Sequence, residues 1–110
     1  MKRLAWATDV HFEFAGVDDV VAFCERVIAL APEALLLTGD IAQAHSIERY
    51  LRALDRALPM PVYFVLGNHD FYYGSIRDVR AAVSAVAADS LHLTWMSAVS
   101  IAIGSTRPRL

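Results

Sequence analysis

The sequence contains a single cysteine, Cys24, among its 110 residues. One thiol cannot form an internal disulfide, and it cannot build a zinc site from several thiolates. Basic residues are also few, because ten Lys and Arg stand against twelve Asp and Glu, for a formal net charge of −2. Proteins that bind nucleic acid by neutralising phosphates carry a basic surplus. We therefore expect no broad binding to nucleic acid and no electrostatic binding to a membrane.

Long apolar runs and glycine-rich phosphate loops are absent as well. The longest uncharged stretch, residues 90–106, is shorter than the ~20 residues that span a bilayer. No apolar region long enough for a signal peptide precedes Ala5-Trp6-Ala7. Neither G-x-G-x-x-G nor G-x-x-x-x-G-K-[ST] occurs, which argues against an ordinary nucleotide-binding domain. With 56% apolar and 20% charged residues, the composition is that of a globular protein, which we expect to be cytoplasmic.

Short apolar runs alternate with longer segments of helical period. The pattern predicts strands at residues 4–8, 34–37 and 62–66, and helices that begin near Asp18, Ser46 and Ser75. Aliphatic strands with helices between them indicate a parallel sheet covered by helices, an α/β fold. Residues 91–96 and 99–103 are weaker strand candidates because Ser, Thr and Gly interrupt them.

Residues that can bind metal ions follow each of the three predicted strands. Thr8-Asp9-Val10-His11 follows the first strand, Thr38-Gly39-Asp40 the second, and Gly67-Asn68-His69-Asp70 the third. Ligands of an open parallel sheet bind beyond the carboxyl ends of its strands. One such cluster would usually be ordinary turn and capping chemistry. Three clusters at consecutive strand ends indicate a functional site.

The residue types in these clusters suit a site with two metal ions. Asp9 and His11 stand two apart, so on extended backbone their side chains would point to the same side and hold one ion. The carboxylate of Asp40 can bridge two cations, which lie ~3.5–4 Å apart in hydrolytic two-metal sites. The amide of Asn68 offers a neutral oxygen. Asp70 is adjacent to His69, and its carboxylate could fix the tautomer of the His69 imidazole and raise its basicity.

In this order and with helix-length spacing, D-x-H, G-D and G-N-H-D resemble the opening motifs of the calcineurin-like metallophosphoesterases. The resemblance implies that the metal ligands are Asp9, His11, Asp40 and Asn68. It implies that Asp40 bridges the first metal to a second metal, which Asn68 also binds. It gives catalytic roles to His69, as the histidine that contacts the substrate and the leaving group, and to Asp70, as its supporting acid.

The resemblance covers roughly residues 3–88, and residues 89–110 are uncertain. It implies that residues 1–110 form a partial domain, the N-terminal half of a helix-flanked double-sheet sandwich. Family members complete the site with a further histidine and a G-H-x-H motif. That motif is absent here, so we expect the remaining ligands to lie beyond Leu110.

Several residues near the motifs have two interpretations. His45 and His92 could supply a missing ligand, although a loop or surface role is more usual for such residues. Phe71, Tyr72 and Tyr73 follow the third motif and suit either stacking on a substrate or packing over their own loop.

The resemblance implies a metal-dependent hydrolase of phosphate mono- or diesters, with a dinuclear centre and a metal-activated water. Its cofactors would be two divalent ions, with manganese, iron or zinc suited to mixed nitrogen and oxygen ligands. Its partner would be a small phosphate ester. The alternative is a truncated, non-catalytic remnant with an incomplete metal site. Because half a fold leaves apolar sheet surface uncovered, we also expect self-association.

Overall fold

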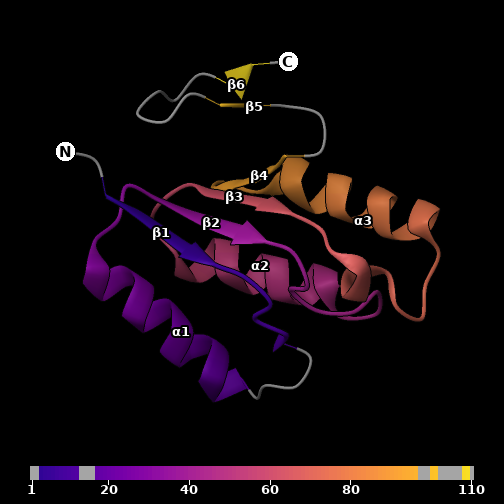
Figure 1. Ribbon diagram of the computed structural model, residues 1–110, viewed down its shortest axis with the longest axis horizontal. Helices are drawn as coiled ribbons and strands as arrows, with labels where there is room; N and C mark the ends of the chain where they lie inside the picture. The colour runs from indigo at the N-terminus through magenta and orange to yellow at the C-terminus, as the bar shows by residue number, and fades with distance from the viewer. Residues whose placement is uncertain (1–2, 13–16, 97–99, 102–107, 110) are drawn as a thin grey trace.

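Four parallel strands form the main sheet of the computed structural model, which describes residues 3–12, 17–96, 100–101 and 108–109 (Figure 1). The strands follow one another across the sheet in chain order: β1 (Leu4–Ala7), β2 (Ala34–Thr38), β3 (Val62–Val65) and β4 (Leu93–Trp95). The helices are α1 (Val17–Leu30), α2 (Ile47–Ala57), the 3-10 helix η2 (Asn68–Phe71) and α3 (Ile76–Asp89). A short antiparallel pair, β5 (Ser100–Ile101) with β6 (Pro108–Arg109), completes the described elements. The α/β fold expected from the sequence is confirmed.

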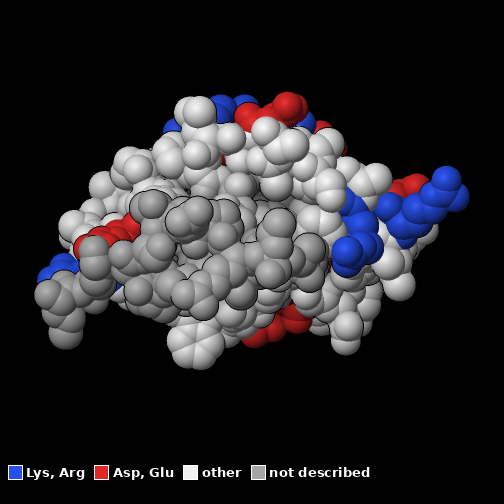
Figure 2. Space-filling view, turned by 90° about the horizontal axis from the view of Figure 1, so that it is seen from above, with Lys and Arg blue, Asp and Glu red and all other residues white. Residues whose placement is uncertain are grey.

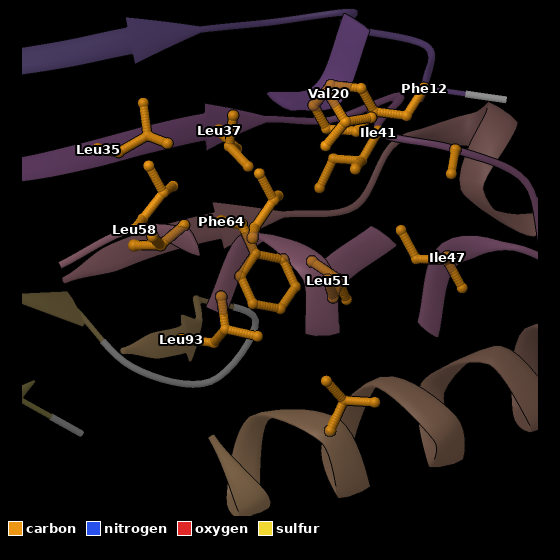
Figure 3. Close-up of a cluster of buried hydrophobic side chains, with 14 of the residues drawn as sticks. Phe12, Val20, Leu35, Leu37, Ile41, Ile47, Leu51, Leu58, Phe64 and Leu93 are labelled. Atoms are coloured by element: carbon orange, nitrogen blue, oxygen red, sulfur yellow. The ribbon is translucent and has the colours of Figure 1, made fainter. Parts of the chain in front are cut away.

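All three α-helices pack on the same face of the main sheet. Each connection joins neighbouring parallel strands in one direction across the sheet, and such crossovers are right-handed in nearly all proteins. Successive crossovers of one hand place their helices on one side, and α2 lies between α1 and α3 in contact with both. A single hydrophobic cluster joins this sheet face to the helices, and Figure 3 shows part of it, with Phe64 of β3 beside Leu51 of α2.

The helix boundaries agree with the sequence in most details. The hydroxyl of Ser75 accepts a hydrogen bond of 3.0 Å from the backbone N–H of Asp78, as expected of a cap. Ser46 stands at the N-cap of α2 without a capping bond, because its hydroxyl donates to the carbonyl of Gln43 instead. Asp18 lies inside the first turn of α1, where a negative charge favours the positive end of the helix dipole.

The opposite face of the sheet is covered by none of the described helices. Trp6 is 72% exposed there, and Leu4 and Val65 are exposed as well. The indole N–H of Trp6 donates to the hydroxyl of Thr38 at 2.8 Å, so this side chain lies across the strand ends on the open side. Parallel sheets are normally covered on both faces. The described part of the chain therefore presents an apolar sheet surface, as the sequence predicted.

None of the described helices is long and apolar enough to cross a membrane. In the view of Figure 2, the Lys and Arg side chains lie in separate groups towards the margins of the molecule. The described residues on that face form no continuous basic patch, in line with the small negative net charge.

Candidate metal centre

The three motifs meet at the carboxyl edge of the sheet. The backbone N–H of Asp9 donates to the carbonyl of Gly39, and that of His11 donates to the carbonyl of Asp40, both at 3.1 Å. The loops after β1 and β2 therefore run side by side. The backbone N–H of His69 donates to Oδ1 of Asp40 at 3.0 Å, which brings the loop after β3 to the same place.

The backbone at this edge is not extended, which corrects one step of the sequence argument. Asp9, His11 and Asp40 have φ values of 53°, 47° and 51°, in the left-handed region that non-glycine residues rarely adopt. The i and i+2 rule for strands thus does not explain how Asp9 and His11 are placed. Such conformations cost of order 1–3 kcal/mol each and cluster at functional sites, where the surrounding structure holds them.

A cluster of two imidazoles and one carboxylate lies at the centre of this edge. His11, Asp40 and His69 each offer a ligand atom, and these atoms lie within 4.8 Å of one another. The His11 and His69 rings meet edge to face with centroids 4.8 Å apart. The family resemblance implied a catalytic role for His69. In the structure its ring lies close enough to His11 and Asp40 for one ion to contact all three residues.

The donor atoms of this cluster suit a cation. Nδ1 of His69 is buried and has no hydrogen-bond partner among the described residues, although it lies 3.3 Å from Oδ2 of Asp40. Buried polar atoms are nearly always satisfied, and a cation held between this nitrogen and the Asp40 carboxylate would satisfy both groups. Nitrogen and oxygen donors together suit zinc, manganese or iron. The residues present therefore fit a divalent metal ion.

Asp9 adds a second carboxyl group next to Asp40. Burial alone would raise the pKa of Asp40, but the backbone N–H of His69, a hydrogen bond with the Asp9 side chain and the His69 ring together lower it. The hydroxyl of Thr8 donates to Oδ2 of Asp9 at 2.8 Å. Two adjacent carboxyl groups repel each other when both are ionised, so they need a shared proton or a cation between them.

The carboxylate of Asp70 bonds to backbone groups of two loops, and its role as the supporting acid of His69 stays a prediction. Its carboxylate is fully buried, and its Oδ1 accepts from the backbone N–H groups of Ile41 and Ala42, each at 2.8 Å. Oδ2 accepts from Gly67 N–H at 2.8 Å. Burial raises the pKa of Asp70, and these three donors oppose that shift. The acid beside the His69 ring is Asp40, whereas Asp70 ties the loop after β2 to the loop after β3.

Gly67 belongs to the site as well, although the sequence indicated no role for it beyond its place in the third motif. A Cβ atom at this position would lie 2.4 Å from Oδ1 of Asp40 and 2.7 Å from its backbone nitrogen. Only glycine lets the two loops approach this closely. The G-N-H-D motif therefore begins with a residue that makes room for the central carboxylate.

The remaining candidates lie in different places. Asn68 opens η2 with an exposed side chain directly before His69, and its role as a ligand stays a prediction. His45 is exposed, in a groove along α2 that Glu48 also lines. His92 precedes β4 at the amino end of the sheet, where its Nδ1 lies 3.4 Å from Oδ1 of Asp55. Neither histidine belongs to the metal-competent cluster of the described residues.

Comparison with known proteins supports what the motifs and the site indicate. Residues 2–101 match the family model described as calcineurin-like phosphoesterase. The chain belongs to this family.

Two curated relatives are named as phosphodiesterases. A probable cyclic nucleotide phosphodiesterase of Pseudoalteromonas sp. (strain SM9913) is 35% identical over 81 residues, which cover 62% of this chain and 31% of that protein. The 3',5'-cyclic adenosine monophosphate phosphodiesterase CpdA of Haemophilus influenzae is 32% identical over 82 residues, covering 63% of this chain and 30% of that protein. The matched part of this chain thus spans less than a third of either relative.

Proposed function

We propose that this protein takes part in the metal-dependent hydrolysis of phosphate esters, with small phosphodiesters as the first substrates to test. The observation that carries the proposal is the cluster of His11, Asp40 and His69, whose ligand atoms lie within 4.8 Å of one another at the carboxyl edge of the sheet. The names of the two relatives favour phosphodiesters, cyclic nucleotides among them.

In this proposal, the residues at the carboxyl edge of the sheet bind metal ions or donate a proton. Asp40, which is hydrogen-bonded to both neighbouring loops, would be the carboxylate shared by two cations. Asp9 and His11 would also hold one of these cations, and Asn68 the other. Two divalent cations, when bound, neutralise phosphate charge and supply a nucleophile from water near neutral pH. His69 faces Asp40 through Nδ1, which leaves its second ring nitrogen to give a proton to the leaving oxygen. Manganese, iron and zinc all suit this donor set.

A groove beside the cluster gives a substrate room to approach. It has a volume of ≈ 720 Å³, and its lining includes His11, Phe12, Phe23 and Arg26. Arg26 and Asp19 both line this groove, so it offers charges of both signs.

A second interpretation is a metal-binding but non-catalytic remnant. It is favoured by the positions of His45 and His92, since neither lies where it could add a ligand to the cluster. The described residues then supply one part of a dinuclear site, and turnover needs further donors.

The open sheet face with Trp6 is the surface through which we propose that the chain self-associates. A cytoplasmic location stays a prediction.

Hydrolysis of generic aryl phosphate esters tests the proposal and separates the two interpretations. The purified chain is assayed with phosphate mono- and diesters at increasing Mn²⁺, with Asp40→Asn as the matched control. Manganese-dependent turnover that disappears in Asp40→Asn supports the enzyme. Folded protein that binds Mn²⁺ and turns over neither ester supports the non-catalytic alternative. Equal activity in both proteins would contradict the assignment of the site.

A further inference from the structure

A row of aromatic rings leads from the metal-competent cluster to the protein surface. The His11 and His69 ring centroids are 4.8 Å apart, those of His69 and Tyr72 are 4.4 Å apart, and those of Tyr72 and Tyr73 are 6.4 Å apart. Exposure rises along the row, since Tyr72 is 45% exposed and Tyr73 is 85% exposed. The two tyrosines thus form an apolar wall, open to solvent, one and two rings away from the cluster.

The same segment shows which aromatic residue serves packing. Phe71 packs against the hydrophobic core, whereas both tyrosines that follow it are exposed. The sequence left two interpretations open for this run, stacking on a substrate or packing over the loop. The structure assigns packing to Phe71. For Tyr73, an 85% exposed ring stabilises the fold little, because burial of apolar area is what stabilises.

The loop that carries the tyrosines is held at several points. The backbone N–H of Tyr72 donates to the carbonyl of His69, and the Tyr72 carbonyl accepts from Ala44 N–H. Gly74, which follows the two tyrosines, lies so close to Ala44 that a Cβ there would be 2.5 Å from the Ala44 side chain. Rings on a loop that is already ordered lose little freedom when a ligand binds, which favours affinity.

We propose that Tyr72 and Tyr73 bind the planar ring of the substrate, a nucleobase in the case of a nucleotide ester, while its phosphate lies at the cluster of His11, Asp40 and His69. This inference rests on the proposed function and adds a specificity element to it. Stacking of a base on an aromatic side chain contributes about 5- to 150-fold in affinity per ring. It tolerates any base, because every base has a flat π face. The wall therefore selects for a planar ring and not for one particular base.

Two ligands that share a phosphate and a sugar but differ in the base test this proposal by binding alone. Adenosine 5'-monophosphate and ribose 5-phosphate are titrated calorimetrically into Mn²⁺-saturated protein. We expect the ligand with the base to bind about tenfold more tightly or better. Tyr73→Ala and Tyr72→Leu should reduce that ratio towards one, and Tyr73→Ala, whose ring does not contact His69, should leave the affinity for ribose 5-phosphate unchanged. Tyr73→Phe, which keeps the ring, should retain it.

Each other result overturns the inference in a distinguishable way. If wild-type protein binds both ligands equally and in an Mn²⁺-dependent manner, the phosphate site stands and the aromatic wall does not bind the base. If the preference for the base persists in both tyrosine variants, the base is bound elsewhere. If folded, Mn²⁺-loaded protein binds neither ligand, the proposed function fails and this inference fails with it. Because both tyrosines are exposed, we expect the variants to unfold at the wild-type temperature, which circular dichroism checks.

Discussion

Gly67 and Asp40 are in contact so close that a single carbon atom added to the glycine would lie 2.4 Å from the carboxylate oxygen Oδ1. The two residues belong to different motifs, after β3 and after β2. Their contact is how two strand ends far apart in the sequence build one site. The position of the central carboxylate thus depends on the absence of a side chain on the neighbouring loop.

Gly67→Ala should therefore weaken metal binding although it removes no ligand. The new methyl group must displace Asp40, and loss of a ligand's support typically costs roughly 10–100-fold in metal affinity. Titration calorimetry with Mn²⁺ measures the effect, and thermal unfolding shows whether the fold survives. Unchanged Mn²⁺ affinity in the folded variant would mean that Asp40 does not need this position.

Asp70→Asn tests the role that the structure gives to Asp70. The amide keeps the shape but places an NH₂ group against backbone N–H donors, which leaves buried donors unpaired. We expect a loss of about 2–4 kcal/mol in the free energy of unfolding, measured with urea. Asp89→Asn is the control, because that side chain is 73% exposed and 4.0 Å from Arg52, and such pairs contribute about 0–1 kcal/mol. A folded Asp70→Asn of full stability that loses only turnover would restore the catalytic role.

His69→Ala should separate proton donation from metal binding. We expect hydrolysis to fall by about 10²–10⁴-fold, the usual contribution of a positioned acid. The Mn²⁺ affinity should fall less than in Asp40→Asn, because Asp9, His11 and Asp40 remain. His92→Ala is the control for loss of an imidazole, and we expect its Mn²⁺ affinity to stay at the wild-type value. Complete loss of metal binding in His69→Ala would show that His69 is an essential ligand.

The open sheet face should make the isolated chain self-associate. Trp6→Lys places a charge on that face, on the edge strand β1, and should lower the sedimentation coefficient at high concentration towards that of a monomer. Leu91→Lys is the control, because Leu91 is 87% exposed but lies before β4, at the other end of the sheet. Analytical ultracentrifugation measures both. A wild-type chain that is monodisperse and monomeric at high concentration would contradict the prediction.

Much of the fold follows from local sequence features. Apolar runs between helical segments predicted β1, β2 and β3, and right-handed crossovers then leave little choice of topology. The start of α3 near Ser75 was predicted in the same way. A strand was also predicted at residues 99–103. Two of these residues, Ser100 and Ile101, form β5, and the other three lie outside the described residues.

The details of the site could not be predicted in this way, because they depend on contacts between loops. A motif shows that Asp70 is present but not that its carboxylate turns towards Ile41 and Ala42. The left-handed backbone at Asp9 and His11 likewise results from hydrogen bonds to the loop after β2, which no local pattern encodes. The separation of Phe71 from the tyrosines after it depends on which side chain reaches the core.

The proposed metal site is tested most directly by calorimetric titration of Mn²⁺ into the folded wild-type chain and into Asp40→Asn. We expect saturable binding to the wild-type chain, and a loss of affinity in Asp40→Asn that exceeds the roughly 10–100-fold cost of removing a ligand's support. Equal binding by both proteins, or no binding by a folded wild-type chain, would contradict the claim that Asp40 is the central ligand of a metal site.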